Sequence, residues 1–274
     1  MEPIRRAPSS TRRAIAFDIM AEDYTKEVTT NPSMMLMRRR TWHFLERIAQ
    51  PGTSILDLGC GVGTDSIFLA SNGCKVHAID TSSMMLEQAR KNARIRGMSH
   101  LIELEQRDIE DLDKASHLQD GSFSGILANF GSLNTLESYE TIDRAFSRLL
   151  ATRGWIVATI MGRDAIWDRL FSIFKNEGKG LAMKRLREGY SLQIGNGEIT
   201  SYFPTPNEFV QQFPHFKQEY CEAIGLLYPP PGVTNRVRFL MPLWRTLANL
   251  EKFISSSRVF RGLGDHFLII LRKR

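Results

Sequence analysis

Acidic and glycine residues with a suggestive spacing gather in the first half of the chain. Asp57 precedes three glycines at alternate positions, Gly59, Gly61 and Gly63, and Asp80 and Asp108 end two later β-like segments. Glycine lacks the Cβ that would keep a ligand away from the backbone, and a carboxylate accepts hydrogen bonds from hydroxyl and amino groups. Between a strand and a helix, these residue types are typical of a site for a nucleotide-like ligand.

The glycine spacing argues against two common ligands of such turns. A dinucleotide fingerprint requires G-x-G-x-x-G, and Thr64 stands where its third glycine would be. A phosphate-binding loop would end in Gly-Lys-Ser/Thr, and no such sequence follows Gly63. Asp57 would repel a nucleotide phosphate but would attract an amino group. The turn therefore favours a ligand with a cationic end.

Three segments of the chain resemble a known family. In order and spacing, LDLGCGVGTD, AIDTSSMMLEQAR and RDIEDL are similar to the S-adenosylmethionine motifs of class I, Rossmann-like methyltransferases. The resemblance covers about residues 14–161 and the closing segment GDHFLIILRKR, and it is strongest to the small-molecule and natural-product branch. AFDIMAEDYTKEV resembles the N-terminal helix of that branch, which carries a Tyr near the cofactor. One departure is ATRGW, where a Pro-Gly-Gly turn is usual.

The resemblance implies S-adenosylmethionine as cofactor, and the residue types suit its parts. Asp57 would orient the ammonium, Asp80 would accept both ribose hydroxyls, and Asp108 would accept from the adenine amino group. The Met85 side chain would pack against the adenine face. The predicted cofactor-binding residues are Tyr24, Asp57, Gly59, Cys60, Gly61, Asp80, Thr81, Met85, Asp108, Ile109 and Asn129.

These residues need a frame of alternating strands and helices. Apolar patterns predict strands and helices in alternation from about residue 54 to 161, with strands over 54–58, 75–79, 101–106, 123–129 and 154–161. Two more strands are expected over 216–228 and 266–274. The fold class is α/β, a doubly wound, mostly parallel seven-stranded sheet of order 3-2-1-4-5-7-6 with the last strand antiparallel, as the resemblance implies.

The chain divides into a core and its additions. We expect an N-terminal helical arm or lid over 1–50, the cofactor-binding core over 51–162 and a lid insertion over 163–203. Residues 204–274 would complete the sheet and hold a second insertion near 229–264. A hairpin is expected across Asn196–Gly197, a favoured type I′ pair. The helical arm could also contact a second copy of the chain.

The two insertions are rich in aromatic residues and would lie at the carboxyl edge of the sheet, where α/β proteins bind ligands. This favours a small, largely apolar or aromatic acceptor, such as a quinone, alkaloid, polyketide or terpenoid. The predicted acceptor-binding residues are Tyr24, Phe130, Arg163, Trp167, Phe171 and Phe203. Positioning for in-line transfer would supply most of the catalysis. Whether carbon, nitrogen or oxygen is methylated stays open.

Two residues are candidates for a catalytic role. Asn129 follows the fourth strand of the core, and His266 opens the last strand at the same edge of the sheet. A general base is needed only if the nucleophile loses a proton, and a histidine at a strand start also serves as a structural residue. His77, within a strand, is interpreted as a packed structural histidine, and His117 as exposed. No metal site is expected.

Alternative functions stay open at this point. Aromatic walls would also suit carbon methylation of a prenyl alkene through a carbocation. A nucleic-acid methyltransferase is disfavoured because NFGSLN replaces the Asn/Asp-Pro-Pro-aromatic motif that holds a flipped base. A non-catalytic scaffold that binds S-adenosylmethionine is the third alternative.

Composition sets wider limits. The 274 residues are 42% hydrophobic with a net charge of +6, and three cysteines show no pairing or metal-ligand spacing, which favours a reducing cytoplasm. Residues 235–274 hold nine basic and two acidic residues, interleaved with apolar ones as in an amphipathic helix. Arg38–Arg40 is interpreted likewise as a solvated helix face. Neither a nucleic-acid partner nor membrane insertion is expected.

Overall fold

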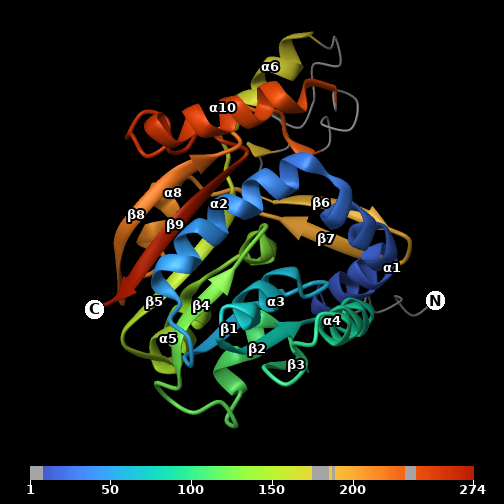
Figure 1. The fold of residues 1–274 in the computed structure, drawn as a ribbon, viewed down its shortest axis with the longest axis vertical. Coiled ribbons are helices and arrows are strands. Elements are labelled where there is room, and N and C mark those ends of the chain that lie inside the picture. The colour runs from blue at the N-terminus through green and yellow to red at the C-terminus, as the bar shows by residue number, and fades with distance from the viewer. Residues whose placement is uncertain (1–8, 175–184, 187–188, 232–238) are drawn as a thin grey trace, which may run out of the picture.

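A seven-stranded sheet runs through the computed structural model, which describes residues 9–174, 185–186, 189–231 and 239–274. The order is β3-β2-β1-β4-β5-β9-β8, and β9 is antiparallel to both of its neighbours (Figure 1). The strands are β1 (Ser54–Leu58), β2 (Lys75–Asp80), β3 (Ile102–Gln106), β4 (Phe123–Ala128), β5 (Leu150–Met161), β8 (Phe216–Ile224) and β9 (His266–Lys273). The predicted sheet is confirmed.

Alternating apolar side chains along the strands build a core on each face of this sheet. On one face, Leu56 and Ile126 belong to a cluster completed by residues of η1 (Ile109–Lys114), α5 (Glu140–Leu149) and α8 (Pro206–Gln211). On the other face, Ile55 and Leu127 belong to a cluster completed by α2 (Pro32–Ile48), α3 (Thr64–Ser71) and α10 (Met241–Ile254). The sheet is therefore covered on both sides, as a largely parallel sheet requires.

Helix boundaries follow the polar residues at their starts. The Ser82 side chain caps α4 (Ser83–Ile95) by accepting from the Met85 amide at 3.0 Å. Thr205 and Glu208 form a reciprocal capping box at the start of α8. Asn31 separates α1 (Ser9–Thr30) from α2 and accepts from two amides of the second helix. Among the described residues, no helix is both long and apolar enough to cross a membrane.

The predicted hairpin is present, but its turn lies one residue earlier than expected. Strands β6 (Tyr190–Ile194) and β7 (Gly197–Ser201) pair with Ile194 opposite Gly197, so Gly195 and Asn196 form the two-residue loop. Gly195 has φ of +56°, and Asn196 has no positive φ. This pattern fits a type II′ turn, with glycine at its first central position, and not type I′.

Gly197 is displaced from the turn because it faces the N-terminal helix. A Cβ at Gly197 would lie 2.3 Å from the Ala16 amide nitrogen, so only glycine lets α1 approach β7 this closely. An ion pair between Arg12 and Glu198 lies beside this contact. Figure 1 shows α1 between the hairpin and α4, over the edge of the sheet where β1 and β2 end. The predicted N-terminal arm therefore packs on its own chain.

This contact predicts the effect of the Gly197→Ala substitution. The added methyl group would press on the α1 backbone, at a cost of about 1–3 kcal/mol, and would raise the undocked population of α1 about five- to 150-fold. Trypsin should then cleave at Arg12 and Arg13 faster, while the sheet stays folded. Gly162→Ala is the control, because Gly162 has no positive φ and the nearest atom to a Cβ there would lie at 3.5 Å, an ordinary contact. Equal cleavage rates in both variants would contradict this role.

Candidate functional site

A cavity of about 120 Å³ lies beneath α1 at the carboxyl edge of β1, β2 and β4. It is lined by Arg13, Phe17, Tyr24, Gly59, Gly61, Asp80, Thr81, Met85, Asp108, Ile109, Asn129, Phe130, Gly131, Ser132 and Thr135. Most of the predicted cofactor-binding residues therefore lie together, although they come from five different parts of the chain. The open α/β sheet explains this, since its strands end at one edge.

The floor of the cavity is formed by glycine backbone. Gly59 and Gly61 have φ of +63° and +54°, in the left-handed region that glycine adopts readily. A Cβ at Gly59 would lie 2.6 Å from the Ser132 Cβ, and one at Gly61 would lie 3.4 Å from the Tyr24 ring. The turn thus passes close to both neighbouring segments and leaves its backbone exposed to the cavity.

Asp80 is fixed at the end of β2 by two backbone amides. One carboxylate oxygen accepts from the Gly61 amide at 2.8 Å, and the other accepts from the Ser82 amide at 2.9 Å. Burial raises the pKa of Asp80, and these two hydrogen bonds oppose that effect. Each oxygen keeps lone-pair capacity for a further donor, so the carboxylate can accept from two hydroxyl groups of a ligand.

Two buried hydroxyls in the cavity have no partner in the described structure. Neither Thr81 Oγ1 nor Ser132 Oγ makes a hydrogen bond, although both atoms are shielded from solvent. Buried polar atoms are normally paired, so these two are suited to a polar ligand. Together with the glycine floor and Asp80, they fit a ligand that carries both ribose-like hydroxyls and a flat apolar part, as S-adenosylmethionine does.

Asp108 is engaged by an arginine that the sequence analysis missed. Arg13 on α1 places Nη2 2.7 and 2.6 Å from the two Asp108 oxygens, and the same nitrogen lies 2.9 Å from Glu110. Arg13 and Asp108 are both nearly buried. Asp108 also caps η1 by accepting from the Glu110 amide. No local pattern marks Arg13, because its partner is 95 residues away.

Asp57 and Cys60 do not line the cavity. Asp57 is buried and accepts from the Ser66 hydroxyl at 2.5 Å. Burial, with nearby Asp65 adding to the effect, raises the pKa of Asp57 to about 7. Cys60 is held in the glycine turn by a hydrogen bond from its amide to the Ile79 carbonyl. A direct contact of either side chain with the cofactor stays a prediction.

Arg38 is buried and Arg40 is partly buried, and both form ion pairs, so the interpretation of Arg38–Arg40 as a solvated face is wrong for these two residues. Arg38 is 3% exposed and pairs with Asp65, which also accepts from Trp42 Nε1 at 2.7 Å. Arg40 pairs with Glu222 of β8. Only Arg39 of the three is exposed. The helix pattern concealed this because the acidic partners lie in elements that meet α2 only in the folded chain.

The two candidate catalytic residues lie on either side of Phe130. Asn129 lines the cavity, donates to Asp65 at 3.0 Å and accepts from the Thr159 hydroxyl at 2.6 Å. His266 is buried outside the cavity, with its ring edge-on to Phe130 at 5.9 Å between centroids. Phe130 has φ of +53°, an uncommon conformation for a bulky residue, and the Arg38 guanidinium stacks on its ring at 4.4 Å.

The predicted acceptor residues of the first insertion do not line this cavity. Arg163 donates to the Phe203 carbonyl and pairs with Glu208, and Trp167 Nε1 donates to the Leu226 carbonyl at 3.1 Å. Phe203 is buried beneath the Arg185 guanidinium. Phe171 belongs to α6 (Ile166–Phe174), but its side chain lies outside the described residues, as do residues 175–184. Their contact with an acceptor stays a prediction.

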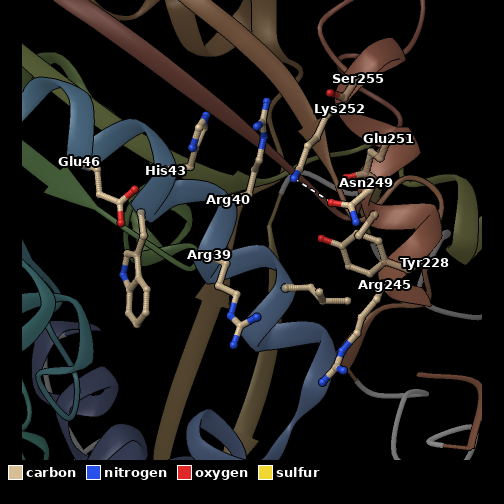
Figure 2. A pocket seen from close by; sticks show the side chains of 13 residues that line it. Arg39, Arg40, His43, Glu46, Tyr228, Arg245, Asn249, Glu251, Lys252 and Ser255 are labelled. Carbon is tan, nitrogen blue, oxygen red and sulfur yellow. Dashed lines mark hydrogen bonds between the residues drawn. The ribbon is translucent and has the colours of Figure 1, made fainter. Parts of the chain in front are cut away.

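A larger hollow of about 420 Å³ lies between α2 and α10 (Figure 2). Its walls carry Arg39, Arg245 and Lys252, beside Glu46 and the buried Glu251. Glu251 already accepts hydrogen bonds from the amides of residues 225–227. Burial raises the pKa of Glu251 to about 7, although these hydrogen bonds oppose the shift. The hollow contains none of the glycine turn or the strand-end acids, so the smaller cavity is the candidate cofactor site.

The pKa of Asp57 predicts how stability changes with pH. Because the folded-state pKa is raised above that of an unfolded aspartate, the folded chain holds a proton that the unfolded chain has lost between about pH 4 and 7. Stability therefore falls as pH rises through this range. Between pH 5.5 and 7.5, Asp57 would contribute a loss of about 2 kcal/mol.

Urea unfolding at the two pH values checks this. The Asp57→Asn variant should lose about 2 kcal/mol less than the unmodified chain over the same interval. Glu251→Gln is a second variant for comparison, since its carboxyl has a similarly raised pKa far from the cavity. An unchanged pH dependence in Asp57→Asn would show that the carboxyl is ionised throughout.

Comparisons with known proteins agree with this geometry. Residues 55–154 match the family model described as a methyltransferase domain. A demethylmenaquinone methyltransferase of Clavibacter sepedonicus is 34% identical over 137 residues, which are 50% of this chain and 52% of that protein. The chain spans between about a fifth and a half of the length of the curated relatives that it matches.

Solved structures share the fold over most of the chain. The [4+2]-cyclase SpnF has a TM-score of 0.64 at 16% identity, covering 100% of this chain and 99% of its own. The Burkholderia thailandensis 1,6-didemethyltoxoflavin-N1-methyltransferase, solved with S-adenosylhomocysteine, has a TM-score of 0.57 at 16% identity, covering 100% and 93%. By its motifs and its sheet, the chain has the class I, Rossmann-like methyltransferase fold, and residues 55–154 match the methyltransferase-domain family.

Proposed function

We propose that this protein transfers the methyl group of S-adenosylmethionine to a small, largely apolar molecule. The observation that carries the proposal is the cavity beneath α1, where glycine backbone, Asp80 and two unpaired hydroxyls meet apolar walls. The ribose would bind Asp80, and the adenine would lie between Met85 and Ile109. Its amino group would face Asp108.

The cavity must enlarge to admit this donor. Its volume of about 120 Å³ is below the roughly 300–1,000 Å³ of sites for drug-sized ligands. The space above it is taken by α1, and Arg13 occupies the carboxylate that the adenine would use. We therefore propose that α1 is a lid, and that donor binding replaces the Arg13–Asp108 contact. This agrees with the predicted arm over residues 1–50.

Tyr24 and Phe130 are the proposed walls between donor and acceptor. Both line the cavity, from α1 and from the loop after β4. Burial raises the pKa of Tyr24, so its hydroxyl stays protonated at neutral pH and is suited to donate a hydrogen bond rather than to act as a base. The acceptor would be held by apolar contacts and by this one polar group.

When bound, S-adenosylmethionine supplies a methyl group already activated by the positive sulfur, so the chain's part is chiefly to orient the acceptor and exclude water. A nucleophile that must lose a proton also needs a base. The surroundings of His266 suit it to that role. Its Nδ1 lies 3.0 Å from Asp265, which leaves Nε2 available to accept a proton. Burial alone would raise the pKa of Asp265, but Arg185 and His266 hold it below its usual value.

The acceptor class rests on the walls and on the relatives. Tyr24 and Phe130, the proposed walls between donor and acceptor, are both aromatic, so the acceptor would meet a largely apolar surface. Among the proteins compared, the names give demethylmenaquinone, 1,6-didemethyltoxoflavin and geranyl diphosphate as substrates, and also 23S rRNA and ribosomal protein L11. We propose a quinone or another specialised metabolite as acceptor, with carbon methylation of a prenyl alkene as the alternative chemistry.

A methyl-transfer assay tests the proposal. The full chain is incubated with S-adenosylmethionine labelled in the methyl group and with separate quinone, phenol, amine and prenyl diphosphate acceptors. Labelled product together with S-adenosylhomocysteine supports transfer, and mass analysis identifies the atom that is methylated. If S-adenosylmethionine binds tightly but is not consumed when cell extracts are added, a non-catalytic scaffold or another reaction on the same fold would be favoured. Absence of donor binding would refute the proposal outright.

Asp80→Asn should weaken donor binding without unfolding the protein. Asparagine keeps one acceptor oxygen and loses the charge, and charge-assisted hydrogen bonds contribute about 1.5–3 kcal/mol each. Calorimetry should therefore show S-adenosylmethionine binding about 10- to 100-fold more weakly. Asp111→Asn on η1 is the matched control, since Asp111 is not among the residues that line the cavity. Equal affinity in all three proteins would exclude the ribose role of Asp80.

His266→Gln distinguishes a base from a structural residue. If His266 accepts the acceptor's proton, kcat should fall by about 10²- to 10⁴-fold, and the pH dependence of kcat should change. Donor affinity should stay the same, because His266 does not line the cavity. His100→Gln, an exposed histidine, serves as control. A fall in kcat with an unaltered pH profile would leave His266 only a packing role.

A further inference from the structure

We propose that His77, Glu105 and His117 form a binding site for one divalent metal ion, with zinc as the preferred ion. The three residues come from β2, from β3 and from the segment that follows η1. One ligand atom of each lies within 4.8 Å of the other two. The site is separate from the donor cavity, which none of the three residues lines.

The pairing of β2 with β3 puts these side chains on one face of the sheet. His77 lies opposite Glu103 in the parallel register, and Glu105 follows two residues later. Side chains two residues apart on a strand point the same way, so His77, Glu103 and Glu105 project from the same face of the sheet. His117 then reaches this face from the connection to β4, which brings a second imidazole to the same carboxylate.

Both imidazoles converge on one oxygen atom. Glu105 Oε2 lies 2.7 Å from His77 Nε2 and 3.1 Å from His117 Nε2. A neutral imidazole has one N–H and one lone pair, and His77 Nδ1 already lies 3.2 Å from a carboxylate oxygen of Glu103. If Nδ1 donates to Glu103, Nε2 presents its lone pair toward Glu105. The Nε2 lone pair and the negatively charged Glu105 oxygen would then repel each other. A cation coordinated by both atoms would remove this repulsion.

The surroundings match the usual support of a metal site. Histidine ligands commonly donate their second ring nitrogen to a carboxylate, as His77 can to Glu103. Arg107 Nε holds the other Glu105 oxygen at 2.5 Å, which fixes the carboxylate and leaves Oε2 for the ion. Phe123 lies edge-on to the His77 ring and closes the inner side.

Two imidazoles and one carboxylate are a ligand set that zinc favours, with a fourth position left for water. That position would face a hollow of about 450 Å³, whose lining includes His77, Glu103 and His117. A bound ion would join β3, an edge strand, to β2 and to the 115–118 segment. Asp80 ends β2 and Asp108 follows β3, so the ion would stabilise the frame of the donor site without taking part in methyl transfer.

Zinc titration of the tag-free full chain tests the site. After removal of metals by a chelator, calorimetry should show one zinc ion per chain, and cobalt should give the visible absorption of a low-symmetry four-coordinate site. His117→Gln removes a half-exposed ligand and should weaken zinc binding at least tenfold. His100→Gln is the matched control, because His100 lines the same hollow but lies outside the ligand set.

Thermal unfolding provides a readout that does not depend on the methyl-transfer activity. Zinc should raise the melting temperature of the unmodified chain and of His100→Gln, and should raise that of His117→Gln clearly less at the same zinc concentration. Without zinc, the three proteins should melt alike, since His117 is partly exposed. No stoichiometric binding, or equal binding by His117→Gln, would overturn the proposal and leave a hydrogen-bonded cluster.

Discussion

The carboxylate of Asp80 is the interaction on which the arrangement of the site depends. It accepts from Gly61 in the turn after β1 and from Ser82 just before α4, and so it joins the loop after β2 to a turn 19 residues earlier in the chain. Ser82 in turn caps α4, and its hydroxyl lies 2.5 Å from Asp18 on α1. One acidic side chain thus sets the positions of the glycine floor, the α4 helix and the helix above them.

Buried ion pairs attach the added segments to the core. Arg13 of α1 meets Asp108, Arg38 of α2 meets Asp65, and Arg185 of the first insertion meets Asp265 and Asp168. Each arginine lies outside the family-matched segment 55–154, and Asp65 and Asp108 lie within it. Loss of one partner would leave an unbalanced buried charge, which costs more than an exposed pair contributes. The ion pairs therefore fix where each added segment packs on the core.

The strands, the helix starts and the strand-end acids could be predicted because their signals are local: apolar periodicity, a capping serine, glycines at alternate positions. Arg13 and Arg38 could not, since their partners lie 95 and 27 residues away and meet them only after packing. The burial of His77 was expected and is confirmed, but its partner Glu105, 28 residues away, could not be predicted. The shift of the hairpin turn likewise follows from a tertiary contact, that of Gly197 with Ala16.

The contact between α1 and the hairpin also has a consequence for the order of events during synthesis. Arg12 and Glu198 are 186 residues apart, so α1 is translated long before the hairpin part of its docking surface exists. The sheet strands β1 to β5 can pair while α1 is still unattached, because domains begin to fold as they emerge. The α1 helix is thus made before the hairpin on which it packs, whereas its partners in α4 and at Asp108 are translated earlier, so α1 can dock on the core first and gain the hairpin contact later.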